Sequence, residues 1–330
     1  MQSVKVGTRG SKLALTQTRQ TADKLAAVGG FAVDLVEVKT DGDILTGPLS
    51  QMGGTGVFAT ALRQAVLDGR ADIAVHSLKD LPTAAAPGLS IAAIPAREDA
   101  RDVLCSRDGL LFADLPAGAK VGTGSPRRAA QLLAARPDLT IVDIRGNVDT
   151  RLGRVPGLPG NATDDVVPGR SGDLDAVVLA ASGLARIGRL DTVSEYFEPD
   201  VMLPAPGQGA LAVECRTADS ATQLGAGVLG QALAAVDDAD TRLAVTAERA
   251  LLARLEAGCS APVGALAHRK GSMLYLESVV CSLDGAKTLR LKLATDGLTE
   301  VGATLLGIDL AEQLLDQGAG DLADLAGSSK

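Results

Sequence analysis

Aromatic side chains are rare in this chain of 330 residues, which has no Trp, two Tyr and four Phe. Proteins that bind single-stranded nucleic acids stack bases on aromatic rings, so this scarcity argues against such a surface. The formal net charge of −8 argues against a general nucleic-acid binder as well, because those proteins carry a basic face. We therefore expect no nucleic-acid partner.

Histidine and cysteine are also scarce. The two histidines are His76 and His268, and the four cysteines are Cys105, Cys215, Cys259 and Cys281. No two of the cysteines have CxxC spacing. A zinc site or a thioredoxin-type motif is therefore not expected, and we predict no metal. Carboxylates and lysines are better candidates for acid–base chemistry than histidine.

Long apolar runs are missing too. No run approaches the length of a membrane span, and a strand-like segment, 4–6, begins without the pattern of a signal peptide. The sequence predicts a cytoplasmic protein that does not associate with membranes.

What the chain does contain is an alternation of strand and helix patterns, with 46% hydrophobic and 22% charged residues. This alternation predicts an α/β fold of two or three domains, built on mainly parallel sheets with helices on both faces. In the first part the expected elements are strand 4–6, helix 11–28, strand 31–39, helix 57–68 and strand 71–75. Between them, the glycine-rich stretch 42–56 is expected to be a mobile loop.

A second α/β unit is expected from about 102 to 190, with strands 119–122, 139–144 and 175–180 and helices 126–135, 147–154 and 181–188. The segments 96–101 and 193–204 would cross between the units, and 211–215 could return to the first sheet. The stretch 156–172, rich in Pro, Gly and Asp, is interpreted as an exposed insertion.

The pattern changes after about residue 217. Helices are expected at 220–236, 238–257 and 300–317, and strands at 263–268, 272–283 and 287–295. Helices packed on a small antiparallel sheet would form a third, α+β domain.

Three separated segments place arginine beside glycine and a hydroxyl or amide residue at the expected start of a helix: Gly7-Thr8-Arg9-Gly10-Ser11, Gly122-Thr123-Gly124-Ser125-Pro126-Arg127-Arg128 and Ile144-Arg145-Gly146-Asn147. Ser125 and Pro126 suit the N-cap and the first helical position. Arginine in a first turn opposes the helix dipole, a cost that is understandable if an anion is bound there. The anion could be a carboxylate or a phosphate. Taken singly, each arginine could also be a solvated residue, an alternative that is weakest for Arg127 and Arg128 because of their unfavourable place in a first turn.

The segment His76-Ser77-Leu78-Lys79-Asp80-Leu81-Pro82 follows a buried-type strand directly. Ligand sites in open α/β sheets lie beyond the carboxyl ends of strands, so Lys79 and Asp80 could line such a site. They could also be an ordinary surface pair. Arg145 follows another buried-type strand, and we expect it at the same sheet edge as Lys79.

Cys259 stands in the loop-like segment Gly258-Cys259-Ser260-Ala261-Pro262. It could be a buried small hydrophobe, but its position between glycine and proline also suits a reactive or modified thiol. The other three cysteines fall within strand patterns and are expected in the core.

Together with Thr150-Arg151-Leu152 and Pro206-Gly207-Gln208-Gly209, these segments occur in an order that resembles hydroxymethylbilane synthase, also called porphobilinogen deaminase. The resemblance covers nearly the whole chain. It implies two lobes like those of type II periplasmic binding proteins, joined by two crossings with a cleft between them, and a third domain. The boundaries we expect are 1–98 with 194–216, 99–193 and 217–330.

The resemblance also implies a transferase of tetrapyrrole (porphyrin and heme) biosynthesis. The family joins four porphobilinogen molecules head to tail, releases ammonia at each step and hydrolyses off hydroxymethylbilane. Its cofactor is a dipyrromethane held through a thioether by one cysteine, and Cys259 matches that position. A monomer is the family expectation.

Each pyrrole carries an acetate and a propionate, so the growing chain is a polyanion, and burying it requires cationic partners. By motif, Asp80 matches the catalytic carboxylate, which would stabilise the cation left by loss of ammonia and move protons. The positions matching cofactor contacts, besides Cys259, are Lys79, Asp80, Thr123, Ser125, Arg127, Arg128, Arg145 and Gly146. Those matching substrate contacts are Arg9, Ser11, Arg145, Arg151 and Gln208.

Two other classes of function compete with this interpretation. A non-catalytic two-lobed protein that binds a small anion would explain the arginines, but not Asp80 and Cys259 in their contexts. A phosphate-handling enzyme would need Gly7 to Lys12 as a phosphate loop, and that segment lacks the G-x-x-x-x-G-K-[ST] spacing.

Overall fold

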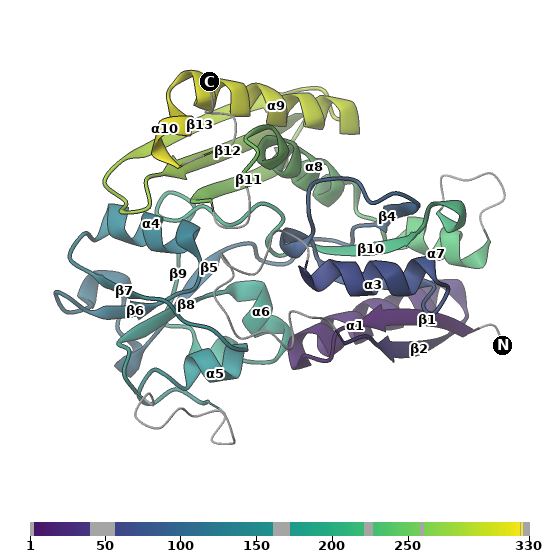
Figure 1. Ribbon diagram of the computed structural model, residues 1–330, viewed down its shortest axis with the longest axis horizontal. Coiled ribbons are helices and arrows are strands. Elements are labelled where there is room, and N and C mark those ends of the chain that lie inside the picture. The colour runs from purple at the N-terminus through teal and green to yellow at the C-terminus, as the bar shows by residue number, and fades with distance from the viewer. Residues whose placement is uncertain are drawn as a thin grey trace.

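The computed structural model describes residues 3–39, 57–160, 172–220, 227–257, 261–323 and 325. Three sheets organise these residues into two lobes and a third unit, which lie at the right, the left and the top of Figure 1. The whole stretch 42–56, most of the insertion 156–172 and Cys259 itself lie outside the described residues.

The sheet of the first lobe has five strands in the order β2-β1-β3-β10-β4. Their bounds are β1 (Ser3–Thr8), β2 (Ala32–Glu37), β3 (Ile73–Ser77), β4 (Leu89–Ala93) and β10 (Leu211–Arg216). Strand β1 is parallel to β2 and β3, whereas β10 is antiparallel to β3 and β4. The predicted return of 211–215 to the first sheet is therefore confirmed, and β4 is a strand that the sequence pattern did not predict.

Helices cover both faces of this sheet, as its apolar runs require. Helices α1 (Lys12–Gly29) and α7 (Val228–Val236) pack on one face, where Leu25 and Leu233 share a core with Val6. Helix α3 (Val57–Leu67) packs on other core residues through Leu62.

The sheet of the second lobe repeats this arrangement in the order β7-β6-β8-β5-β9. The strands are β5 (Asp102–Ser106), β6 (Lys120–Gly122), β7 (Thr140–Val142), β8 (Ala176–Ala180) and β9 (Glu195–Tyr196). In both sheets the fourth strand in this order, β10 or β5, is antiparallel to its neighbours. This shared topology, with two chain crossings between the lobes, confirms the predicted fold of two lobes like those of type II periplasmic binding proteins.

Helix α4 (Pro126–Ala135) packs on one side of the second sheet, and α5 (Val148–Leu152) and α6 (Ala181–Arg186) pack on the other. Alternation along β5 explains this, because Leu104 joins one core while Val103 and Cys105 join the other. Short 3₁₀ helices complete the two lobes: Leu78–Asp80, Arg107–Gly109, Phe112–Asp114, Leu190–Thr192 and Thr217–Asp219.

The third unit is an antiparallel sheet, β11 (Val263–Lys270), β12 (Met273–Cys281) and β13 (Thr288–Thr295), which packs against α8 (Ala239–Arg254) and α9 (Glu300–Asp316). The short α10 (Ala319–Leu322) follows. Cys105, Cys215 and Cys281 are buried in β5, β10 and β12, as predicted, and burial raises the pKa of each thiol to about 11.

The division into 1–98 with 194–216, 99–193 and 217–330 stays a proposal. One contact bears on it: α7, which falls in the third segment, contributes Ala232 and Leu233 to the core of the first lobe. We therefore propose that the first lobe extends to the end of α7.

Candidate active site

The three arginine segments all start helices, as predicted from their cap residues. Ser11 and Ser125 accept hydrogen bonds from the backbone N–H groups of Ala14 and Arg128, at 3.3 and 3.4 Å. Asn147 accepts one from Thr150 N at 2.8 Å. These side chains satisfy amides that a helix start leaves free, so the caps explain where α1, α4 and α5 begin.

Lys79 and Asp80 lie in the short 3₁₀ helix that follows β3, at the carboxyl end of that strand. Lys79 donates from Nζ to Gln208 Oε1 at 3.2 Å, whereas Asp80 is exposed. Burial lowers the pKa of Lys79 to about 8; the charge of Asp80 opposes this shift, and that of Arg128 adds to it.

Arg127 and Arg128 meet an anion, but that anion belongs to the protein. Both side chains are buried and contact Asp102, with Arg127 Nη1 at 2.6 Å from Oδ2 and Arg128 Nε at 2.9 Å from Oδ1. Burial by itself would raise the pKa of Asp102, but the two guanidinium groups hold it well below its usual range. The carboxylate of Asp102 thus compensates, within the fold, for the unfavourable position of the two arginines in the first turn of α4.

The sequence analysis did not single out Asp102. The sequence feature that could have identified it is a lone carboxylate at the start of an otherwise apolar strand, Asp102–Ser106, directly after a segment interpreted as a crossing.

Gln208 connects this cluster to Lys79. It has no exposed surface, and its Nε2 donates to Ala100 O at 2.7 Å and to Asp102 Oδ1 at 2.9 Å. Thr123, also buried, accepts from Ser125 N at 3.2 Å through Oγ1. The polar side chains of this region therefore hold one another in place.

The expectation that Arg145 lies at the same sheet edge as Lys79 is wrong. Arg145 follows β7 of the second sheet, whereas Lys79 follows β3 of the first. The two sheet ends nevertheless come together electrostatically: the pKa of Arg151 falls to about 10 through burial and the charges of Arg128 and Arg145, and Asp80 of the first lobe opposes that shift. These residues therefore come from the ends of strands in two different sheets, one in each lobe, and not from one shared sheet edge.

Gly146 and Arg151 are linked by a hydrogen bond from Arg151 Nε to Gly146 O, at 2.8 Å. Gly146 has φ of 99°, and a Cβ there would lie 2.9 Å from Thr150 Cγ2. A glycine is therefore needed for the chain to pass from Arg145 into α5.

Arg9 and Asp80 line a small cavity of about 30 Å³ together with Gln17 and Ser77. The sequence analysis missed Gln17, which is buried on α1 and accepts from Ser77 Oγ at 3.2 Å and from Arg186 Nη1 at 3.3 Å. Arg186 lies on α6 of the second lobe, so the pair also joins the lobes. A polar residue at a helix position expected to be buried is the sequence feature that could have identified Gln17.

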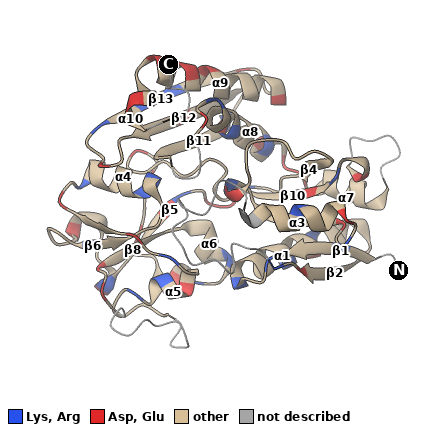
Figure 2. Cartoon of the chain, viewed as in Figure 1, with Lys and Arg blue, Asp and Glu red and all other residues tan. Residues whose placement is uncertain are grey.

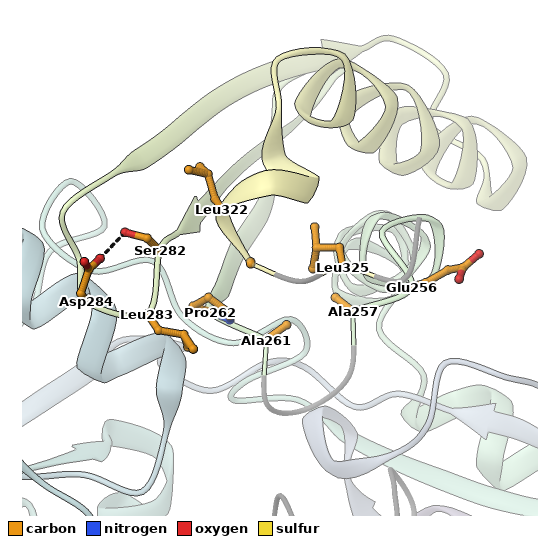
Figure 3. Close-up of a pocket in the computed structure, with 10 residues that line it drawn as sticks. Glu256, Ala257, Ala261, Pro262, Ser282, Leu283, Asp284, Leu322 and Leu325 are labelled. Atoms are coloured by element: carbon orange, nitrogen blue, oxygen red, sulfur yellow. Dashed lines mark hydrogen bonds between the residues drawn. The ribbon is translucent and has the colours of Figure 1, made fainter. Parts of the chain in front are cut away.

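Cys259 lies outside the described residues, but both of its described flanks line a cavity of about 620 Å³ in the third unit. Ala257 and Ala261 border it from one side, and Leu322, Leu325 and Leu283 contribute apolar walls (Figure 3). Ser282 donates to Asp284 at 2.6 Å within the same wall.

The charges of this region suit a ligand with several carboxylates. Acidic and basic positions are interspersed over all three units (Figure 2), so the positive charge of this region is local. Within it, Arg128 contributes to lowering the pKa of both Lys79 and Arg151, which means that cations face one another. A polyanion would relieve that repulsion, and the residues present fit a dipyrromethane with its acetate and propionate groups.

Comparison with known proteins decides the family. A family model described as porphobilinogen deaminase, dipyromethane cofactor binding domain matches residues 4–224, and one described as porphobilinogen deaminase, C-terminal domain matches 242–316. A porphobilinogen deaminase of Cutibacterium acnes is 56% identical over 99% of both chains. One of Leifsonia xyli is 53% identical over 98% of this chain and 95% of its own. The chain belongs to the porphobilinogen deaminase family.

Membership in the porphobilinogen deaminase family identifies an enzyme of the transferase class in tetrapyrrole biosynthesis, with a dipyrromethane cofactor binding domain and porphobilinogen as substrate. It does not favour the alternative of a non-catalytic anion-binding protein. A periplasmic substrate-binding protein of an ABC transporter from Coxiella burnetii aligns with 71% of this chain and 91% of its own, at 16% identity and a TM-score of 0.42. The fold assignment rests on strand order and not on that likeness.

Two further findings concern the described part of the chain. It contains no helix long and apolar enough to cross a membrane, and no cluster of three or more His, Cys, Asp or Glu that could hold a metal ion.

Proposed function

We propose that this chain is a hydroxymethylbilane synthase that joins four porphobilinogen molecules, releases ammonia at each addition and liberates hydroxymethylbilane by hydrolysis. The observation that carries the proposal is a group of cations around the exposed carboxylate Asp80, in which the charge of Arg128 opposes the charges of both Lys79 and Arg151. Such a group suits a polycarboxylate chain that reacts through a cation.

The cofactor contacts are proposed at the positions matched by motif. Cys259 would carry the thioether, and the carboxylates would be held by Lys79, Thr123, Ser125, Arg127, Arg128, Arg145 and Gly146, with Asp80 near the pyrrole N–H groups. When bound, the dipyrromethane supplies the pyrrole carbon to which the first substrate is joined. Burial of several carboxylates then has the cationic partners that it requires.

Asp80 is the proposed catalytic residue. Loss of ammonia from porphobilinogen leaves a cation, and an exposed carboxylate can stabilise that charge and accept the proton released from pyrrole carbon when the new bond has formed. Its place directly after β3, next to Lys79, fixes it at the carboxyl end of a strand where ligands of such sheets bind.

The incoming porphobilinogen is proposed to contact Arg9, Ser11, Arg145 and Arg151. Arg9 and Asp80 line the same small cavity, which supports a carboxylate-binding role for Arg9 beside the proposed catalytic residue. Arg145 and Arg151 reach the same region from the second lobe. Gln208, matched by motif to a substrate contact, has its side chain engaged within the protein.

The test is the denatured intact mass of the purified protein beside a Cys259→Ala variant. An increment of two pyrrole units in the wild type that is absent from the variant is expected. A wild type that carries no increment, and cannot acquire one when incubated with porphobilinogen, would refute the proposal and revive a non-catalytic anion-binding role.

We further propose that the enzyme acts as a monomer in the cytoplasm, without nucleic-acid or membrane partners. Light scattering of the loaded protein tests the first point, and cell fractionation tests the second.

A further inference from the structure

The side chain of Asp102 is the acceptor on which three side chains of the proposed site converge. It has no exposed surface and lies at the start of β5. Arg127 Nη1, Arg128 Nε and Gln208 Nε2 donate to it at 2.6, 2.9 and 2.9 Å, and Arg128 Nη2 lies 2.8 Å from Oδ1. Asp102 itself is not among the residues matched by motif to the family's site.

Gln208 extends the cluster to the first lobe. Its Oε1 accepts from Lys79 Nζ at 3.2 Å, and its two amide protons go to Asp102 and to the carbonyl of Ala100. The chain of contacts from Lys79 through Gln208 and Asp102 to Arg128 therefore crosses from one lobe to the other. Because both amide protons are used within the protein, Gln208 has none left to donate to a substrate.

We propose that Asp102, with Gln208 as its link, is a positioning residue that sets the orientation and the net charge of the cationic wall formed by Lys79, Arg127 and Arg128. This inference rests on the proposed function. An arginine side chain has many rotamers, and a carboxylate that contacts Nε and Nη2 together selects one of them. Val178 O, 3.1 Å from Arg128 Nη1, fixes the guanidinium plane further.

The charge balance gives Asp102 a second effect. The three cations Lys79, Arg127 and Arg128 and the one Asp102 carboxylate leave two net positive charges, so the wall still attracts carboxylates while its cations repel one another less. The charged groups that act on Lys79 are Asp80 and Asp102, which favour its protonated form, and Arg127 and Arg128, which oppose it. Without the Asp102 charge, the protonated form of Lys79 is harder to maintain.

The test is Asp102→Asn, which keeps the shape of the side chain and removes its charge. In the loaded enzyme we expect KM for porphobilinogen to rise about tenfold or more, since charge-assisted contacts of the wall are misaligned. The alkaline limb of kcat/KM is expected to move to lower pH, because Lys79 loses its proton more readily. A purely structural role would not shift that limb.

Glu214→Gln is the matched control. Glu214 is likewise buried and holds an arginine with two hydrogen bonds, from Arg63 Nε at 3.0 Å and Nη2 at 2.8 Å, but it lies on β10, where its charged partners are Arg63 and His76 rather than the cations of the wall. We expect it to lose stability while KM and the alkaline limb stay at their wild-type values.

Gln208→Leu is the second variant, since it leaves the ion pairs of Asp102 with Arg127 and Arg128 in place and removes the hydrogen bonds of Gln208 to Lys79, Asp102 and Ala100 O. It too should shift the alkaline limb downward, even if Asp102→Asn does not fold. A wild-type KM and an unmoved limb in Asp102→Asn, or an unmoved limb in a folded Gln208→Leu, would overturn the inference. If the wild type carries no cofactor, both the proposed function and this inference are refuted. If the wild type is loaded but the variants keep its KM and alkaline limb, only this inference is refuted.

Discussion

Arg97 donates two hydrogen bonds to the carboxylate of Glu248, from Nη1 at 2.6 Å and from Nη2 at 3.1 Å. Glu248 has no exposed surface and also accepts from the backbone N–H groups of Gly207 and Ala267, at 2.6 and 2.8 Å. One carboxylate on α8 thus joins the inter-lobe crossing, the loop before Gln208 and the sheet of the third unit.

Glu248→Gln is predicted to destabilise the protein by about 3–5 kcal/mol, the usual cost of breaking a buried ion pair from one side. An amide in that place turns an NH2 donor toward Arg97 and toward one of the two backbone N–H groups. Urea unfolding at pH 7 measures the loss. As control, Glu312→Gln removes a partner of Arg254 in an exposed pair, N···O 3.3 Å, and should cost less than about 1 kcal/mol. Equal losses in the two variants would contradict the bridging role of Glu248.

Asp80→Asn is predicted to lower kcat by about 10²–10⁴-fold, because an amide can neither accept the proton nor balance the developing cation. Asp80 is exposed, so we expect an unchanged unfolding curve. The assay is steady-state turnover of porphobilinogen by protein whose intact mass shows the cofactor. Near-normal turnover by such loaded protein would remove Asp80 from the mechanism.

Lys79→Met is predicted to stabilise the cofactor-free protein at pH 7 by about 2 kcal/mol while it impairs activity. Burial lowers the pKa of Lys79 from 10.5 to about 8; a shift of one unit corresponds to about 1.4 kcal/mol, reduced here because the side chain is partly exposed. Below pH 8 the folded wild type bears the cost of a buried ammonium group.

The pH dependence of that difference provides the check. Between about pH 8 and 10.5 the unfolded wild type binds more protons than the folded one, so wild-type stability rises with pH relative to the variant. The advantage of Lys79→Met should therefore shrink over this range and vanish near its upper end. Urea unfolding of both proteins at pH 7, 9 and 10.5 measures it, and a constant difference would show that Lys79 is not buried as a cation.

Much of the fold could be predicted from local signals. The helix expected at 126–135 is α4 (Pro126–Ala135), because Ser125 and Pro126 define its start. Strand β4 was missed, and β9 spans only Glu195–Tyr196. A segment of two residues, such as β9, carries too little periodicity to be recognised.

The site could be predicted only as far as its motifs reached. The sequence analysis expected a bound anion beside Arg127 and Arg128, and it could not show that the protein itself supplies a carboxylate there, Asp102, which lies 25 residues before Arg127. Glu248 likewise has the pattern of an ordinary helical glutamate. Its importance comes from contacts with Arg97 and Gly207, which only the folded chain brings near.

Gly307 on α9 lies close against the backbone of α8, and Gly307→Ala tests how tightly the third unit is packed. A Cβ at this position would lie 2.3 Å from the carbonyl oxygen of Ala247 and 2.8 Å from Leu251 N, both backbone atoms of α8. Neither can move without the helix, so the two helices must separate and open the core that contains Leu251 and Leu310.

Alanine is the better helix former by about 1 kcal/mol, so local propensity alone would predict a gain in stability. We expect a loss of about 1–3 kcal/mol instead, because overpacking outweighs that gain. Gly183→Ala is the matched control: this glycine lies within α6, and a Cβ there would meet nothing within 4 Å. It should be neutral or stabilising in the same urea titration. A stabilised Gly307→Ala would mean that α8 and α9 can separate at little cost, and that the third unit tolerates movement of the helix that leads to Cys259.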